Sequence, residues 1–186
     1  MVRIISGECR GRKLASLKGR QLRPTSDRAK ETLFDMLQAR IKGARFLDLF
    51  AGTGSIGLEA ASRGAAEAVL AESDPEALKI IEANIVHCGL SHRVRVCGHD
   101  YQSCLARFET NHEAFDLIFL DPPYDDASAY LLIQPVWEKG LLKKGGLVIA
   151  EHDRRLPLPP CYGALVLLRS RRVGDTVFSF YGEHLE

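Results

Sequence analysis

The sequence of 186 residues lacks several features that mark specialised classes of protein. No apolar run reaches the ~18 residues that a membrane-spanning helix needs, so we expect no membrane partner. The N-terminus has no apolar segment of the kind found in signal peptides, and no internal repeat is present. These absences predict a cytoplasmic protein.

Cysteine and histidine are too scattered for a disulfide framework or a metal site. The five cysteines are odd in number and none has Cys-x-x-Cys spacing. The six histidines form no His-Glu-x-x-His pattern. Cys97, His99 and Cys104 lie close in sequence, but a structural zinc site prefers paired close spacings. We therefore expect reduced cysteines and no metal.

What remains is the composition of an ordinary globular domain with an uneven charge distribution. Hydrophobic residues make up 46% and charged residues 26% of the chain, which suits one domain with a short appendage. Residues 1–45 hold 12 Lys and Arg against 4 Asp and Glu, whereas residues 46–186 hold 13 against 20. A basic N-terminus on an acidic body predicts a polyanionic partner, with a solvated basic tail as the alternative.

Residues 1–24 form the basic part, in which short apolar pieces alternate with glycines. We expect a small β-hairpin arm there and assign residues 25–186 to the main domain. Its arginines and lysines would contact phosphates, which gives affinity without reading a sequence of bases. The predicted nucleic-acid-binding residues are Arg3, Arg10, Arg12, Lys13, Arg20, Arg23 and Arg28.

Beyond the arm, strand and helix patterns alternate. A helix capped near residues 25–27 precedes a strand at 45–50, and a further helix is expected at 127–139 with a kink at Pro135. The alternation predicts a doubly wound α/β fold with a mostly parallel sheet. Two final strands at 164–169 and 176–181 should form an antiparallel hairpin. The other expected strands cover 66–71, 94–97, 115–120 and 147–150.

Four successive strands end near an acidic residue. The acids are separated by 24, 28 and 21 residues, close to the ~30 residues of a strand-helix-strand unit. In such a sheet the ligand crevice lies outside the carboxyl ends of the strands, so the four carboxylates should meet there. They are Asp48, Glu72, Asp100 and Asp121.

A glycine motif follows the strand at 45–50. Residues 52–57 read Gly-x-Gly-x-x-Gly and Glu72 lies twenty residues after Gly52, as in dinucleotide sites. A pyrophosphate would face Asp48 and Asp121, and like charges 4 Å apart cost ~4 kcal/mol at an effective dielectric of 20. S-adenosylmethionine has no phosphate and carries a sulfonium and an ammonium, so an acidic crevice favours it. A nicotinamide-dependent oxidoreductase is the alternative.

The cofactor contacts follow from this choice of ligand. Glu72 would accept both ribose hydroxyls and Asp100 the adenine amino hydrogens. Gly52 and Gly54 would let the methionine part pass close to the backbone. The predicted cofactor-binding residues are Asp48, Gly52, Gly54, Glu72 and Asp100.

The stretch Asp121-Pro122-Pro123-Tyr124 follows an apolar run of buried-strand length. Two successive prolines remove two backbone donors, so the strand must stop there. A carboxylate, exposed prolyl carbonyls and an aromatic ring remain at the crevice, and this combination suits a planar base held by its amino group. A strand end followed by a turn is the simpler alternative.

Several motifs resemble those of a known enzyme family. Asp48-Leu49-Phe50-Ala51-Gly52-Thr53-Gly54 together with Asp121-Pro122-Pro123-Tyr124 resembles a class I S-adenosylmethionine-dependent amino-methyltransferase. Leu22-Arg23-Pro24-Thr25-Ser26-Asp27-Arg28 and Arg10-Gly11-Arg12 resemble the RsmD family, which methylates the exocyclic N2 of one guanine in small-subunit (16S) ribosomal RNA. Ser26, where threonine is expected, and an acid-rich segment after Tyr124 depart from the pattern.

The resemblance implies a fold, a cofactor, a partner and catalytic roles. It implies a class I methyltransferase Rossmann-like fold with a seven-stranded sheet and S-adenosylmethionine as cofactor. The partner would be ribosomal RNA, in the small subunit or its assembly intermediate, and the enzyme a monomer. Asp121 and the Pro122 carbonyl would hold the amino hydrogens while Tyr124 stacks on the base. Adenine N6 or cytosine N4 of DNA, or a protein glutamine, remain alternative acceptors.

Overall fold

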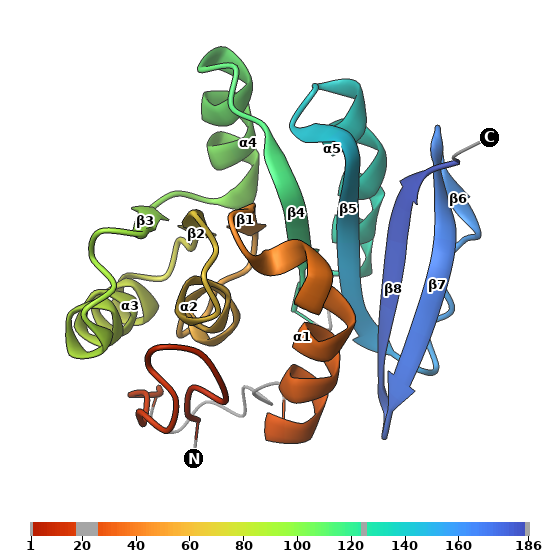
Figure 1. Ribbon diagram of the computed structural model, residues 1–186. Helices are drawn as coiled ribbons and strands as arrows, with labels where there is room; N and C mark the ends of the chain where they lie inside the picture. Colours follow the sequence, from red (N-terminus) through yellow and green to blue (C-terminus); the bar gives the residue numbers. More distant parts are fainter. Residues whose placement is uncertain (1, 18–25, 124–125, 185–186) are drawn as a thin grey trace.

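The structure is a computed structural model that describes residues 2–17, 26–123 and 126–184 (Figure 1). A mixed sheet of eight strands crosses the molecule in the order β3-β2-β1-β4-β5-β8-β7-β6. The sheet carries helices on both faces, as expected of a Rossmann-like α/β fold. No helix among the described residues is long and apolar enough to cross a membrane.

The first five strands are parallel and the last three antiparallel, as the sequence predicted. The expected C-terminal hairpin is β7–β8. An eighth strand, β6, has two residues and pairs only with the start of β7, which makes it too short to leave a sequence pattern. The strands are β1 (Arg45–Asp48), β2 (Glu67–Ala71), β3 (Val94–Cys97), β4 (Phe115–Leu120), β5 (Leu142–Asp153), β6 (Cys161–Tyr162), β7 (Leu165–Val173) and β8 (Thr176–Glu183).

The helices begin at the capping residues that the sequence offers. Ser26 caps the first helix by accepting from the Ala29 amide at 3.1 Å, and Asp74 caps the third. The expected helix at 127–139 is instead a 3₁₀ helix followed by a short α-helix, and Pro135 lies in the first turn of the latter, where its missing N–H costs little. The helices are α1 (Asp27–Ile41), α2 (Ser55–Ser62), α3 (Pro75–Cys88), α4 (Tyr101–Thr110), η1 (Ala127–Leu132) and α5 (Ile133–Glu138).

The N-terminal segment, residues 2–17, packs on the main body near α2 and α3 (Figure 1). An antiparallel bridge joins Arg3 to Lys13, which is the part of the expected hairpin that the structure describes. Ile4 is fully buried in the same apolar cluster as Leu58 and Ile81. This segment is therefore part of a shared core.

A buried ion pair ties this segment to the helices behind it. Lys30 on α1 and Glu59 on α2 are both fully buried, with 3.8 Å between Nζ and Oε2. The Lys30 ammonium also donates to the Arg3 carbonyl at 2.5 Å, and Glu59 accepts from the amides of Ile5 and Ser6 at 2.7 and 2.9 Å. Each charge thus has several partners, which a buried charge requires.

Candidate active site

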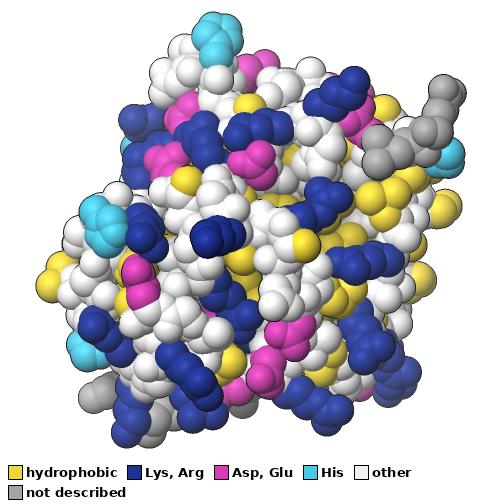
Figure 2. Space-filling view, viewed as in Figure 1, with side chains coloured by type: hydrophobic (Ala, Val, Ile, Leu, Met, Phe, Trp, Pro, Cys, Tyr) yellow, Lys and Arg dark blue, Asp and Glu magenta, His cyan; other side chains and the backbone are white. Residues whose placement is uncertain are grey.

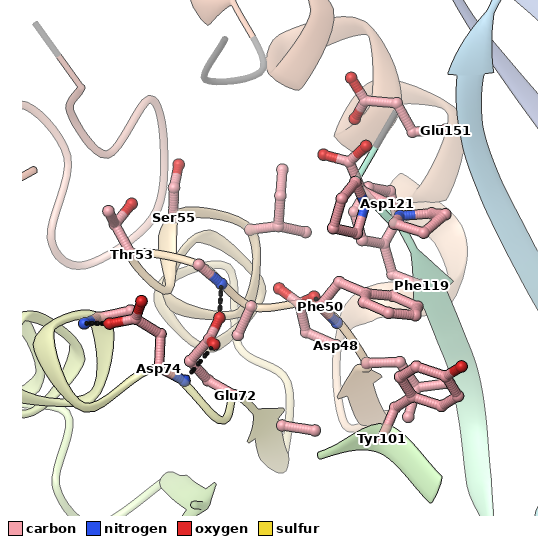
Figure 3. Close-up of a pocket in the computed structure, with 18 of the residues that line it drawn as sticks. Asp48, Phe50, Thr53, Ser55, Glu72, Asp74, Tyr101, Phe119, Asp121 and Glu151 are labelled. Carbon is pink, nitrogen blue, oxygen red and sulfur yellow. Dashed lines mark hydrogen bonds between the residues drawn. The ribbon is translucent and has the colours of Figure 1, made fainter. Parts of the chain in front are cut away.

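A cavity of about 650 Å³ opens where the parallel strands end (Figure 3). It is the crevice expected of an open α/β sheet. The four acids predicted to converge there all line it, together with the predicted Gly52, Pro122 and a fifth acid. Five of the acids in its lining come from the C-terminal parts of the five parallel strands or from the loops that follow them: Asp48, Glu72, Asp100, Asp121 and Glu151.

The glycine motif separates into three structural roles. Gly52 and Gly54 have φ values of +54° and +78°, in the left-handed region that side chains disfavour. Gly57 instead allows α2 to pack tightly on β2, because a Cβ there would lie 1.9 Å from Leu70 Cδ2. The motif therefore shapes the loop and seats the helix that follows it.

The Glu72 carboxylate is fixed by three backbone amides. Gly52 donates to Oε2 at 2.9 Å, while Ser73 and Asp74 each donate to Oε1 at 2.8 Å (Figure 3). A carboxylate has about four lone-pair sites, so one site, on Oε2, remains to accept from a hydroxyl of a ligand. The observed geometry holds this acceptor at the cavity wall in advance of binding.

Asp48 is buried and Asp121 is partly buried, and the charge of Asp121 disfavours ionisation of Asp48. Burial raises the pKa of Asp48 to about 7, and the neighbouring charge of Asp121 adds to the rise. Burial also raises the pKa of Asp121 well above its ordinary value, with Glu151 contributing. The Phe50 amide donates to Asp48 at 3.4 Å, which partly offsets the cost. Such a site favours a cationic ligand, because a positive charge would stabilise the ionised acids.

Glu151 is a site residue that the sequence analysis missed. Leu120 of β4 pairs with Ala150 of β5, so the next residues, Asp121 and Glu151, are neighbours at the strand ends. Both side chains reach the cavity, and Figure 3 shows their carboxyl groups side by side. The signal was available, since Glu151 directly follows the strand predicted at 147–150, as Glu72 and Asp121 directly follow theirs.

Asp100 lies on the more open side of the cavity, where it caps α4. Its carboxylate accepts from the Ser103 amide at 2.9 Å and from the Ser103 hydroxyl at 2.8 Å, and these bonds lower its pKa. Next to it the rings of Phe50 and Tyr101 pack with centroids 5.2 Å apart. Sequence reasoning did not identify this aromatic pair, which gives the cavity a flat apolar wall suited to a planar ring.

Comparisons with known proteins agree with this geometry. The sequence profile of a family described as "Conserved hypothetical protein 95" matches residues 2–182. The chain belongs to this family, the RsmD family. The match spans the N-terminal segment, the cavity and the C-terminal hairpin together, so the resemblance inferred from the motifs is confirmed.

Three similar proteins illustrate the relationship. The Escherichia coli K12 protein named "Ribosomal RNA small subunit methyltransferase D" is 35% identical over 97% of this chain and 89% of its own. The Haemophilus influenzae protein of the same name is 38% identical over 84% of this chain and 81% of its own. A solved structure of a hypothetical protein from Thermus thermophilus has a TM-score of 0.85, at 35% identity, and covers 99% of this chain and 100% of that one.

The basic residues predicted in this RsmD-family chain have different surroundings. Arg3 forms an ion pair with Asp27 at 2.8 Å, and Arg12 donates to the His87 carbonyl at 2.6 Å. Three others are exposed: Arg10, Lys13 and Arg28. Ser16 and Leu17 line the cavity, so the N-terminal segment borders it. The remaining predicted residues, Arg20, Arg23 and Tyr124, lie outside the described residues.

No group of three His, Cys, Asp or Glu side chains in the described part of the chain could hold a metal ion. The five cysteines are free, and only Cys161 among them is exposed. The chemistry of the cavity must be sought in its carboxylates, its backbone groups and the ligand they hold.

Proposed function

We propose that this protein transfers a methyl group from S-adenosylmethionine to the exocyclic N2 amino group of a guanine in small-subunit ribosomal RNA. One observation carries the proposal: the glycine loop, Glu72 and Asp121 all open onto one acid-lined cavity. The RNA substrate is supported by the names of the relatives, which belong to small-subunit ribosomal RNA methyltransferases.

The residues of the cavity fit this cofactor. Asp48 and Glu151 are buried and Asp121 is partly buried beside them, and a sulfonium or an ammonium would stabilise their charges where a pyrophosphate would be repelled. Gly52 and Gly54 would allow the amino-acid end to approach the backbone. This acidity disfavours a nicotinamide dinucleotide in the same loop.

The nucleoside end of the cofactor would lie at the open side of the cavity. Glu72, held by three amides, would accept the ribose hydroxyls. Asp100 would accept the adenine amino hydrogens beside the ring of Tyr101. Both carboxylates keep acceptor sites beyond those used within the chain.

Asp121 and Pro122 would present the acceptor amine. The bound cofactor supplies an electrophilic methyl group. A guanine N2 lone pair is delocalised into its ring, so the amine is a poor nucleophile and its orientation matters. The Asp121 carboxylate and the Pro122 carbonyl would accept the amino hydrogens and turn the lone pair outward, with Tyr124 stacked on the base. Alignment of this kind supplies much of the rate enhancement.

The base would have to leave its helix or loop to enter the cavity. Flipping a nucleotide costs a few kcal/mol, and less at an unpaired site. We propose that the substrate is presented within the small ribosomal subunit or its assembly intermediate, in the cytoplasm, and that the enzyme acts as a monomer.

The decisive experiment offers labelled S-adenosylmethionine with four acceptors: naked small-subunit ribosomal RNA, small-subunit particles, duplex DNA and bulk protein. We expect label in the RNA of one of the first two, and mass spectrometry of nuclease digests should identify N2-methylguanosine. Label in DNA or protein alone would favour the alternative acceptors. Calorimetric binding of NAD without binding of S-adenosylmethionine would overturn the proposal.

The Asp121→Ala variant tests the role of the acid at the end of β4. It should lose methyl transfer while calorimetry still detects cofactor binding, because Asp121 is assigned to the acceptor. A matched control is Glu82→Ala, which removes an exposed carboxylate on α3. Wild-type turnover in Asp121→Ala would show that the assigned role is wrong.

A further inference from the structure

A second basic surface lies on the C-terminal hairpin. We define the hairpin surface as Arg169, Arg171 and Arg172 of β7, which are all exposed. The turn that follows them borders the cavity, because Asp175 and Thr176 belong to its lining. The register pairs Arg171 with Phe178 and Arg172 with Val177, so these two arginines lie within a few residues of the cavity rim.

The charges of the hairpin surface are not cancelled within the described chain. Arg171 has no hydrogen-bond or ion-pair partner among the described residues, and Arg172 donates only to the Gly174 carbonyl, at 2.7 Å. Arg169 lies over the Phe180 ring and donates to the Met36 carbonyl, which fixes its guanidinium without neutralising it. Figure 2 shows a column of Lys and Arg side chains on the flank formed by β7 and β8.

Neighbouring arginines behave differently. Arg154 pairs with Asp175 at 2.8 Å, and Arg155 pairs with Asp153 at 2.8 Å. These pairs hold the cavity rim together and contribute little net charge. The positive potential beside the rim therefore comes from the three arginines of β7.

The hairpin surface and the N-terminal segment flank the cavity from different sides. The N-terminal segment packs against α2 and α3, near β2 and β3 at one end of the strand order, and contributes Ser16 and Leu17 to the cavity. The hairpin lies beyond β5, towards the other end, and contributes Asp175 and Thr176. Figure 1 shows the two segments at opposite sides of the sheet, and the lining residues that each contributes place the acidic crevice between them.

This charge arrangement selects what can enter the crevice. A phosphate backbone is attracted to the basic flanks and repelled by the buried acids between them. A neutral base meets no such repulsion. The arrangement therefore holds a nucleic-acid backbone across the crevice while admitting only a base.

We propose that the hairpin surface binds backbone phosphates of the RNA substrate, on the side of the cavity away from the N-terminal segment. The inference rests on the proposed function, which supplies RNA as the partner. Arginine suits this task, because its planar guanidinium can bind phosphate through two parallel hydrogen bonds. The contact would position the RNA without reading its bases.

The test is an Arg171→Glu/Arg172→Glu double variant of the full chain, with small-subunit ribosomal RNA as the ligand. The Kd should rise about tenfold or more at 0.1 M salt, and the slope of log K against log salt should fall by about 1.4 to 1.8, as for two lost phosphate contacts. Cofactor affinity and kcat at saturating RNA should be unchanged, since neither arginine touches the cavity chemistry.

Two further variants make the result unambiguous. Lys144→Glu reverses an exposed charge near the start of β5, at the end of that strand away from the cavity, and should leave the salt slope unchanged. Arg171→Gln/Arg172→Gln should give a smaller loss of affinity with the same reduced slope. If thermal melting shows that Arg171→Glu/Arg172→Glu does not fold, the salt slope of Arg171→Gln/Arg172→Gln tests the proposal in its place.

The two proposals fail in different ways. A wild-type protein that methylates no RNA would refute the proposed function. A wild-type protein that methylates RNA, with arginine variants of unchanged affinity and salt slope, would overturn the hairpin surface alone.

Discussion

Asp121 and Glu151 extend side by side from adjacent parallel strands into one cavity. Neighbouring strands lie about 5 Å apart, so two ionised carboxylates there repel each other strongly in a buried site. Asp48, from the strand on the other side of β4, adds a third acid. Tyr130 donates to the Glu151 carbonyl at 2.6 Å and so holds that strand end in place. Burial and these neighbouring charges raise the pKa values of Asp48 and Asp121.

The first prediction concerns the pH dependence of catalysis. Burial and Glu151 raise the pKa of Asp121, and Glu151→Gln removes one of these causes while keeping the side-chain shape. The pKa of Asp121 should therefore fall, and the acidic limb of kcat/KM should move to lower pH. A pH profile of methyl transfer measures the shift, with Glu82→Gln as the control. An acidic limb identical to that of the wild type would exclude this coupling.

The second prediction concerns stability against pH without cofactor. The pKa of Asp48 is raised from 3.8 to about 7. Its contribution to the stability of the folded protein is therefore fully present below pH 4 and is lost as pH rises through 7. Each pKa unit is worth about 1.4 kcal/mol, which makes ionised Asp48 cost up to about 4 kcal/mol. Asp48→Asn should thus gain stability relative to the wild type between pH 5 and pH 8, as measured by urea unfolding.

Asp116→Asn is a control for that experiment, because it should change the free energy of unfolding with the opposite dependence on pH. Burial alone would raise the pKa of Asp116, but hydrogen bonds from Lys143 and the Arg45 amide lower it. Its contribution is therefore present above pH 4 and lost in acid. Asp116→Asn should be destabilised at pH 8 and approach the wild type at low pH. If the free energy of unfolding changed with pH in the same way in Asp48→Asn and in the wild type, the raised pKa of Asp48 would be refuted.

The third prediction concerns the buried ion pair. Glu59→Ala would leave Lys30 buried without its counter-charge and would remove the acceptor of the Ile5 and Ser6 amides. We expect a loss of about 3–5 kcal/mol in the free energy of unfolding. Urea denaturation measures it, and Glu31→Ala on the exposed side of α1 should change it by about 0.5 kcal/mol at most. A loss below about 1 kcal/mol in the free energy of unfolding of Glu59→Ala would contradict the stabilising role of this ion pair and its hydrogen bonds.

The fourth prediction concerns Gly57. Alanine normally stabilises a helix by about 1 kcal/mol relative to glycine. Here the added Cβ would collide with Leu70 of β2, so Gly57→Ala should instead destabilise the protein by about 1–3 kcal/mol. Thermal melting measures the sign, and Gly57→Ala should cost less when it is made in a Leu70→Ala background, where the colliding side chain is absent. A stabilised Gly57→Ala variant would show that α2 can move away from the sheet.

Much of the fold could be predicted, because its signals are local. The cap at Ser26, the left-handed Gly89 after α3 and the strand-end acids all follow from short-range chemistry. The acids Asp48 and Asp121 could be brought together from spacing alone, since parallel strands share one carboxyl edge.

Other features could not be predicted, because they depend on contacts between distant segments. The basic residues at the N-terminus indicated a small hairpin arm but not its packing, in which Ile4 is buried and Arg12 is bonded to α3. The aromatic pair joins Phe50, in the turn after β1, to Tyr101, the first residue of α4, 51 residues further along the sequence. Residues 127–139 form a 3₁₀ helix and then an α-helix, and this division likewise depends on packing that the spacing of apolar residues does not reveal.

The anchoring of the N-terminal segment limits how it can be exchanged between relatives. Its amides at Cys9 and Ala15 donate to the side chains of Ser62 on α2 and Asn84 on α3, at 3.0 and 2.8 Å. A chimera that receives the first 17 residues of a relative would have to receive matching acceptors on both helices as well. The segment and the two helices therefore form one exchangeable unit, and a graft of the segment alone should fold poorly.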